Sequence, residues 1–147
     1  IDRVELMTYD LFDAFGYHAD FSGTANAVFQ TINAGFQPEQ IDIGLPFYSR
    51  PIDGSEYWGD YKAYAERLGR YNNLIIDNTF DHDGAPLATP QYFNSVQMVS
   101  DKTAFALDAG VGGVMIWHLT CDLPYDNELS LLRAIQTVKN EKATADG

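Results

Sequence analysis

The sequence predicts an α/β fold in which parallel strands alternate with helices that pack outside the sheet. Three short runs rich in strand-forming residues, 4–10, 41–50 and 112–117, are separated by segments whose apolar residues recur at helical spacing. A helix between two strands of one sheet is the usual crossover between parallel neighbours. Each run also ends in polar or aromatic residues, and ligands bind at the carboxyl ends of parallel strands.

The first strand is expected over residues 4–10, where side chains alternate between two faces and Asp10 ends the strand. One face carries Val4, Leu6 and Thr8, and the other carries Glu5, Met7 and Tyr9. A helix is expected from about residue 23 onward. Its expected features are an apolar stripe of Val28, Phe29 and Ile32, an N-cap at Ser22 or Thr24, and a stop at Gly35.

The second strand is expected over residues 41–50, after the break at Pro38. Its two faces are Ile41, Ile43, Leu45 and Phe47 on one side, and Gly44, Pro46, Tyr48 and Arg50 on the other. Residues 51–90 are less regular. A short amphipathic helix over 58–68, a strand over 74–80 and a turn over 81–84 are expected there.

The last third of the chain is expected to form a helix, a strand and a helix. The first helix covers 94–108, with Val96, Val99, Thr103 and Ala106 on its inner stripe and Gly110 at its end. The strand covers 114–117. The final helix is expected to be capped by Asp126 and to bury Leu131, Leu132, Ile135 and Val138, while residues 143–147 form a frayed tail.

Length and charge exclude several classes of protein. The 147 residues suffice for one domain, whereas a complete eight-fold barrel needs roughly 250. A net charge of −12 repels phosphate backbones, so no nucleic-acid partner is expected. No apolar run approaches the roughly 20 residues of a membrane helix, so no membrane partner is expected either. The chain begins at Ile1, almost inside a strand, and is expected to be part of a longer protein.

Three strand ends carry a resemblance when they are taken in order: MTYD at 7–10, GLPFYSR at 44–50 and GGVMIW at 112–117. As a set they resemble the sixth, seventh and eighth strands of the family 18 glycoside hydrolases, the chitinase and endo-β-N-acetylglucosaminidase family. The resemblance is loosest across 51–90. It implies that residues 1–142 are the C-terminal portion of a (β/α)8 TIM barrel, its last three βα units, with 51–90 as a short insertion between the seventh and eighth strands.

The resemblance also assigns roles to individual residues. Catalytic roles fall on Tyr9, which would donate to the substrate's N-acetyl group, and on Asp10, which would belong to the polar network around the catalytic acid. Substrate-binding roles fall on Met7 and Trp117 as the floor beneath the sugar, and on Tyr48 and Arg50 as contacts at its edge. Ser49 stands where the family usually has Gly.

These residue types suit the family's chemistry, in which the substrate's own 2-acetamido oxygen attacks the anomeric carbon. The reaction needs a donor, a carboxylate and an apolar wall, and Tyr9, Asp10 and Trp117 have those properties. The family's general acid is the Glu that ends a DxxDxDxE run on the fourth strand, and this sequence contains no such run. Because general acid catalysis typically contributes ~10²–10⁴-fold, the chain alone is expected to be inactive.

The resemblance implies that the intact parent is a chitinase-like hydrolase of β-1,4-linked N-acetylglucosamine polymers, secreted or at the cell surface. Its expected partners are an N-acetylglucosamine-containing polysaccharide and the missing N-terminal part of the barrel. No cofactor is expected, and no metal, because the histidines lack zinc spacing and the acidic turn at 81–84 lacks the outer ligands of a calcium loop. Two alternatives stay open: an endo-β-N-acetylglucosaminidase acting on glycoprotein glycans, and a non-catalytic sugar-binding protein.

Several candidate residues also fit purely structural roles. Trp117 can fill the core, and Tyr48 with Arg50 can be a surface loop pair. The aromatic cluster at 57–64 is expected to be the core of the insertion, with a sugar platform as the alternative. Cys121 has no His or Asp partner at a recognisable spacing, so it is expected to act as a small hydrophobic residue in a loop.

Overall fold

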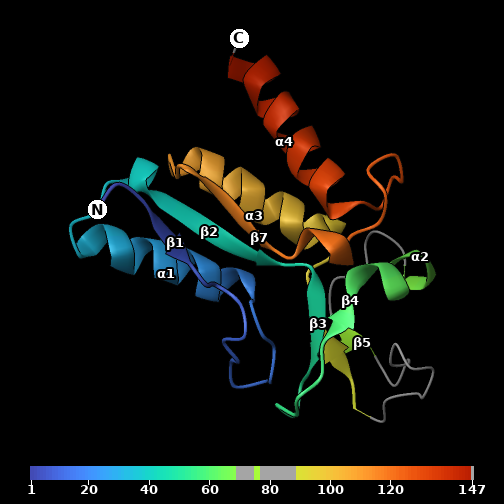
Figure 1. Cartoon of the computed structure of the whole chain (residues 1–147). Helices are drawn as coiled ribbons and strands as arrows, with labels where there is room; N and C mark the ends of the chain where they lie inside the picture. The colour runs from blue at the N-terminus through green and yellow to red at the C-terminus, as the bar shows by residue number, and fades with distance from the viewer. Residues whose placement is uncertain (69–74, 77–88, 147) are drawn as a thin grey trace.

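The computed structural model describes residues 1–68, 75–76 and 89–146 (Figure 1). Its strands and longer helices are β1 (Val4–Leu6), α1 (Phe21–Asn33), β2 (Ile41–Pro46), β3 (Tyr48–Pro51), β4 (Gly59–Asp60), α2 (Ala65–Leu68), β5 (Ile75–Ile76), β6 (Gln91–Tyr92), α3 (Val96–Asp108), β7 (Gly113–Trp117) and α4 (Leu131–Asp146). Short 3-10 helices cover Pro38–Gln40, Tyr61–Ala63 and Leu119–Cys121.

The strands β1, β2 and β7 form a parallel sheet with β2 in the middle. The register pairs Val4 with Ile41 and Pro46 with Trp117, so the three strands run the same way. The helix α1 packs against β2, and α3 packs against β7 and α4 (Figure 1). Parallel strands joined through helices confirm the predicted α/β fold.

The strand β2 lies at the centre of the hydrophobic core. The predicted inner face is confirmed, because Ile41, Ile43, Leu45 and Phe47 are all fully buried. They pack with buried side chains of α1, α3 and α4, among them Val28, Val99 and Leu131. The predicted stripe of α3 is confirmed as well, with Val96, Val99, Thr103 and Ala106 buried. This core fixes the strands whose carboxyl ends carry the candidate site.

The first strand is shorter than predicted, because β1 ends at Leu6 rather than at Asp10. The Thr8 hydroxyl donates to the Gly44 carbonyl over 2.7 Å and accepts from the Gly44 amide over 2.9 Å. Beyond the end of β1, hydrogen bonds of the Thr8 side chain therefore take the place of the backbone hydrogen bonds between β1 and β2. Asp10 then has φ of 55°, in the left-handed region, which turns the chain away from the sheet.

The prediction of a single second strand is also wrong, because residues 41–50 form two strands in different sheets. The Phe47 amide donates to the Trp117 carbonyl over 2.8 Å, and its own carbonyl accepts from the Tyr61 amide over 3.1 Å. The chain thus leaves the parallel sheet at Phe47. Beyond it, β3 pairs antiparallel with β4 and β6, and β5 pairs with β6. Figure 1 shows this second sheet turning away from the end of β2.

The predicted elements within 51–90 are present in part. The amphipathic helix is split between Tyr61–Ala63 and α2, and the predicted strand over 74–80 coincides with β5 at Ile75–Ile76. Residues 74 and 77–80, together with the predicted turn at 81–84, lie outside the described residues.

The ends of α1 and α3 were predicted correctly, whereas the predicted capping residues of α1 and α4 were wrong. Gly35 and Gly110 follow α1 and α3 with φ of 108° and 73°. The α1 cap is Asp20, whose carboxylate accepts the Gly23 amide over 3.0 Å.

At α4 the predicted cap Asp126 is replaced by Asp122, whose carboxylate oxygens accept the Leu131 and Leu132 amides over 2.8 and 2.9 Å. The helix also continues to Asp146, where a frayed tail was expected. Within the described residues, no helix combines the length and apolar character needed to cross a membrane.

Candidate functional site

The carboxyl ends of β1, β2 and β7 meet at one edge of the parallel sheet, and the candidate residues follow these ends. Tyr9 lies over Gly44 of β2. A Cβ on Gly44 would come within 2.8 Å of the Tyr9 ring and 2.5 Å of the Leu6 carbonyl, so only glycine permits this approach. The Tyr9 hydroxyl lies 3.8 Å from the Met115 sulfur of β7. Tyr9 therefore spans all three strands.

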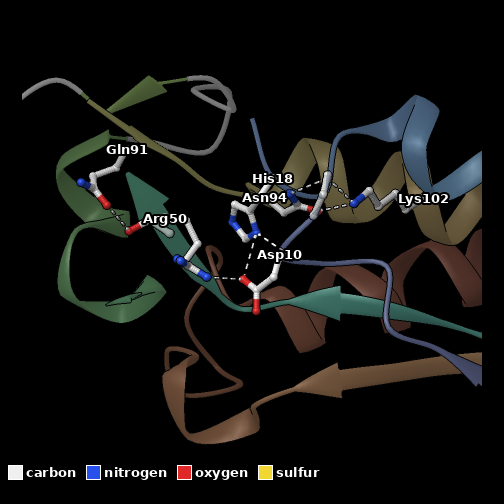
Figure 2. Close-up of polar contacts among 8 residues, drawn as sticks. Asp10, His18, Arg50, Gln91, Asn94 and Lys102 are labelled. Carbon is white, nitrogen blue, oxygen red and sulfur yellow. Dashed lines mark hydrogen bonds and ion pairs between the residues drawn. The ribbon is translucent and has the colours of Figure 1, made fainter. Parts of the chain in front are cut away.

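Asp10 and Arg50 form an ion pair beside Tyr9 (Figure 2). The Nη1 of Arg50 donates to Oδ1 of Asp10 over 2.8 Å. The Arg50 side chain is 8% exposed, whereas that of Asp10 is 38% exposed. The guanidinium also lies over the rings of Phe12 and Trp58, at 5.2 and 4.6 Å from their centroids. Arg50 is thus held rigidly, and the carboxylate that it orients stays open to solvent.

Tyr48 completes this group. Its ring packs edge-on against Tyr9, with centroids 6.3 Å apart. Its pKa is raised by burial and by the negative charge of Asp10, whose carboxylate hydrogen-bonds the Tyr48 hydroxyl. The pKa of Tyr9 is raised as well, by burial and then by Asp10. Both phenols therefore remain protonated donors at neutral pH.

Trp117 stands at the end of β7 with 55% of its surface exposed, so the core-filling alternative does not hold within this chain. It lines a cavity of about 370 Å³ together with Tyr48, Trp58, Asp60, His118 and Cys121. Met7, which is 70% exposed just beyond β1, does not line this cavity. The site therefore gathers Tyr9, Asp10, Tyr48 and Arg50 closely, and Tyr48 also lines the cavity that contains Trp117.

The aromatic cluster at 57–64 divides between the two roles considered for it. Tyr61 and Tyr64 are buried in the core, as expected. Trp58 is 47% exposed and lines the cavity, so the predicted core role does not hold for this residue. The alternative of a surface loop pair does not hold for Tyr48 and Arg50, which are buried at 3% and 7% exposure.

Cys121 does have partners in space, contrary to the sequence-based expectation. Its thiol donates to Oδ1 of Asp60 over 3.3 Å and lies 3.4 Å from Nε2 of His118. Burial and the neighbouring Asp60 raise the pKa of Cys121 to about 11. The thiol is therefore protonated and a poor nucleophile at neutral pH. Among the described residues, no group of three or more His, Cys, Asp or Glu side chains is arranged to hold a metal ion.

Sequence reasoning missed His18 and Lys102, both of which are fully buried behind Asp10. The imidazole of His18 stacks on Tyr48 with centroids 5.3 Å apart. Lys102 lies on α3, where the helical pattern marked its neighbours but not the lysine itself. No sequence motif marks either residue, because each combines a partner eight positions away, Asp10 or Asn94, with one in a distant segment, Tyr48 or Ala19.

The comparisons with known proteins agree with this geometry. The sequence profile of the family described as Glycosyl hydrolases family 18 matches residues 1–122. A family 18 chitinase from the chitin utilization locus of Flavobacterium johnsoniae has a similar fold, with a TM-score of 0.72 and 20% identity over 97% of this chain and 43% of that one. A chitinase from Bacteroides thetaiotaomicron gives 0.71 and 23% over 97% and 47%.

A chitinase-like agglutinin from Robinia pseudoacacia is similar too, with a TM-score of 0.65 and 20% identity over 94% of this chain and 47% of that one. These identities support the fold alone. The chain spans less than half the length of each of these three proteins. Because the family profile matches most of its length, the chain belongs to the glycosyl hydrolases of family 18.

Proposed function

We propose that these 147 residues are the last three βα units of a (β/α)8 barrel in a longer protein, called the parent protein below. The parent protein hydrolyses β-1,4-linked N-acetylglucosamine polymers with retention, through attack by the substrate's own acetamido group. The observation that carries this proposal is the placement of Tyr9, Asp10 and the Trp117 cavity at one edge of the parallel sheet.

The order of the parallel strands supports the barrel. Among the described residues, β1 and β7 are the outer strands and each pairs only with β2. A free strand edge is a template for further pairing. A groove of about 270 Å³ flanks β7 and is lined partly by Val111, Val114, Ile116, Leu132 and Ile135. We assign this groove and both edges to the N-terminal part of the barrel, because the similar solved chains are more than twice as long.

The chemistry of substrate assistance assigns a task to each group. The Tyr9 hydroxyl donates to the acetamido group and holds its oxygen near the anomeric carbon. The Asp10 carboxylate favours the positive charge that develops on the acetamido group as the oxazolinium ion forms. The exposed indole of Trp117 provides the apolar wall against the sugar. Arg50 has little free surface, so its main contribution is to hold Asp10.

The leaving oxygen must be protonated by a general acid from outside this chain, since the sequence has no DxxDxDxE run. Sugar binding in this fold is supported by two similar structures. One is an Ostrinia furnacalis Group II chitinase domain in complex with penta-N-acetylchitooctaose, and the other is a Group IV chitinase of that species in complex with allosamidin.

Hydrolysis of chitin oligomers by the parent protein tests the proposal. Proton NMR early in the reaction should show the new reducing end as the β-anomer, because attack by the acetamido oxygen and then by water retains configuration. An α-anomer formed first would contradict substrate assistance. Release of glycans from glycoproteins without cleavage of chitin oligomers would redirect the activity to endo-β-N-acetylglucosaminidase action.

The 147-residue chain provides the matched control. It should show no turnover, and sedimentation should show self-association, because the edges of β1 and β7 and the exposed Met7 and Trp117 would otherwise face water. Turnover by this chain would overturn the assignment of the acid to another segment. A sharply melting monomer would overturn the barrel-fragment proposal.

A second candidate function is sugar binding without catalysis. The similarity to a chitinase-like agglutinin favours it. Tight binding of chitin oligomers by the parent protein without any turnover would support this candidate and exclude the hydrolase.

A further inference from the structure

His18 lies behind the candidate site and contacts two of its residues, Asp10 and Tyr48. Its side chain is completely buried, and Nδ1 accepts the backbone amide of Asp10 over 3.3 Å. The same nitrogen lies 3.8 Å from Oδ1 of Asp10 (Figure 2). The ring stacks on Tyr48 with an interplanar angle of 29°. One imidazole therefore touches the backbone of one site residue and the ring of another.

The hydrogen bond from the Asp10 backbone amide determines which tautomer the neutral His18 ring adopts. Because Nδ1 accepts a proton, the neutral tautomer must carry its hydrogen on Nε2. Burial lowers the pKa of His18 to about 4; the negative charge of Asp10 opposes this shift, and the charges of Lys102 and Arg50 add to it. The ring is thus neutral at neutral pH. Among the described residues, Nε2 makes no well-formed hydrogen bond, and the backbone of Tyr48 is the group that favours its protonated form.

The residue after His18 is anchored to α3. Ala19 has φ of 57°. Its carbonyl accepts from Nζ of Lys102 over 2.7 Å and from the side-chain Nδ2 of Asn94 over 3.2 Å. Nζ of Lys102 also donates to Oδ1 of Asn94 over 2.6 Å. Figure 2 shows these groups behind His18, on the side away from Arg50. Among the described residues, Lys102 forms no ion pair with a carboxylate, and the charge of the nearby Asp20 only partly offsets the cost of its burial.

We propose that His18 is a positioning residue for the reaction. Its Nδ1 fixes the backbone of Asp10, its ring fixes Tyr48, and Lys102 with Asn94 holds the loop that carries it. This arrangement holds the Asp10 carboxylate and the Tyr48 side chain next to each other at the candidate site. The kinetic part of the inference rests on the proposed function, whereas the structural part does not.

Two substitutions in the parent protein separate the two contacts of His18. His18→Phe keeps an aromatic ring against Tyr48 but removes the acceptor for the Asp10 amide. His18→Asn places an amide oxygen near the position of Nδ1 and so restores the acceptor without the full ring. Val99→Ala is the matched control, because Val99 is equally buried on α3 but does not touch the site.

For His18→Phe we expect kcat to fall at least about tenfold while KM changes less than about threefold, because misplacing a reacting group acts mainly on the chemical step. His18→Asn should retain kcat within about threefold of the starting protein. Val99→Ala should lower Tm and leave kcat unchanged. An unchanged kcat in His18→Phe would overturn the proposal, as would an equal loss of kcat in Val99→Ala.

Amide hydrogen exchange at Asp10, followed by NMR, tests the structural part without reference to activity. The Asp10 amide should be protected in the parent protein, should exchange faster in His18→Phe, and should regain protection in His18→Asn. The same slow exchange in all three proteins would overturn the positioning role. If the parent protein proves inactive, the proposed function fails, and this exchange series still decides the role of His18.

Discussion

The guanidinium of Arg50 donates to the Asp10 carboxylate over 2.8 Å, across 40 positions of sequence. Asp10 follows the edge strand β1 of the parallel sheet, and Arg50 belongs to β3 of the antiparallel sheet. The ion pair therefore joins the two sheets at the edge where the candidate site lies. It also orients a carboxylate that is partly open to solvent.

Arg50→Met in the parent protein should lower the free energy of unfolding by about 1–3 kcal/mol, because a buried charged donor is lost from a carboxylate. The lower part of that range is expected, since Asp10 stays partly solvated. Urea unfolding of Arg50→Met, Asp10→Asn and the double variant measures the coupling between the two residues. Strict additivity of the two single effects would show that the pair contributes nothing.

Tyr9→Phe in the parent protein should lower kcat at least about tenfold, equivalent to about 1.4 kcal/mol, if its hydroxyl orients the acetamido group. The melting temperature should change little, since the ring over Gly44 is retained. Tyr125→Phe is the control, because Tyr125 is an exposed tyrosine in the loop before α4. Equal kcat values in Tyr9→Phe and Tyr125→Phe would exclude the role of Tyr9.

Trp117→Ala should weaken binding of chitin oligomers by at least about tenfold, or about 1.4 kcal/mol. Its cost in stability should stay well below the ~3–5 kcal/mol typical of a buried tryptophan, because 55% of the residue is exposed. Leu45→Ala is the contrasting control, since Leu45 is fully buried and should lose stability without losing affinity. Calorimetric titration and denaturant melts separate the two effects. A large loss of stability with unchanged affinity would return Trp117 to the core.

Lys102 should make stability depend on alkaline pH. Burial lowers its pKa to about 7 from the ordinary lysine value of 10.5. Between these values the unfolded chain binds more protons than the folded one, so stability should rise with pH across this window. Below pH of about 7 both states are protonated, and this gain is absent.

Melting temperatures of the parent protein and of Lys102→Met, measured from pH 6 to pH 10, test this expectation. The difference in free energy of unfolding between the two proteins, derived from these melts, should change by several kcal/mol in favour of the unsubstituted protein as pH rises. Lys142→Met is the control, because Lys142 pairs with Asp108 on the surface and is partly exposed. A pH-independent difference would mean that Lys102 titrates normally in the folded state.

Local patterns predicted the elements well where one physical signal dominated. The alternation of Ile41, Ile43 and Leu45 requires a buried strand face, and Gly35 and Gly110 supply the positive φ that ends a helix. Helix starts were less predictable, because several acidic or hydroxyl side chains precede each helix. Asp20 and Asp122 became the capping residues because the fold brought their carboxylates to the free amides.

The sequence by itself determined the α/β alternation and the identity of Tyr9, Asp10, Tyr48, Arg50 and Trp117 as candidates. These features depend on hydrophobic period, turn chemistry and motif residues, all of which are local. Only the tertiary structure decided that β2 and β3 belong to different sheets and that Arg50 and His18 converge on Asp10. Such contacts join distant segments through packing, and burial then sets the charge of groups such as His18 and Lys102.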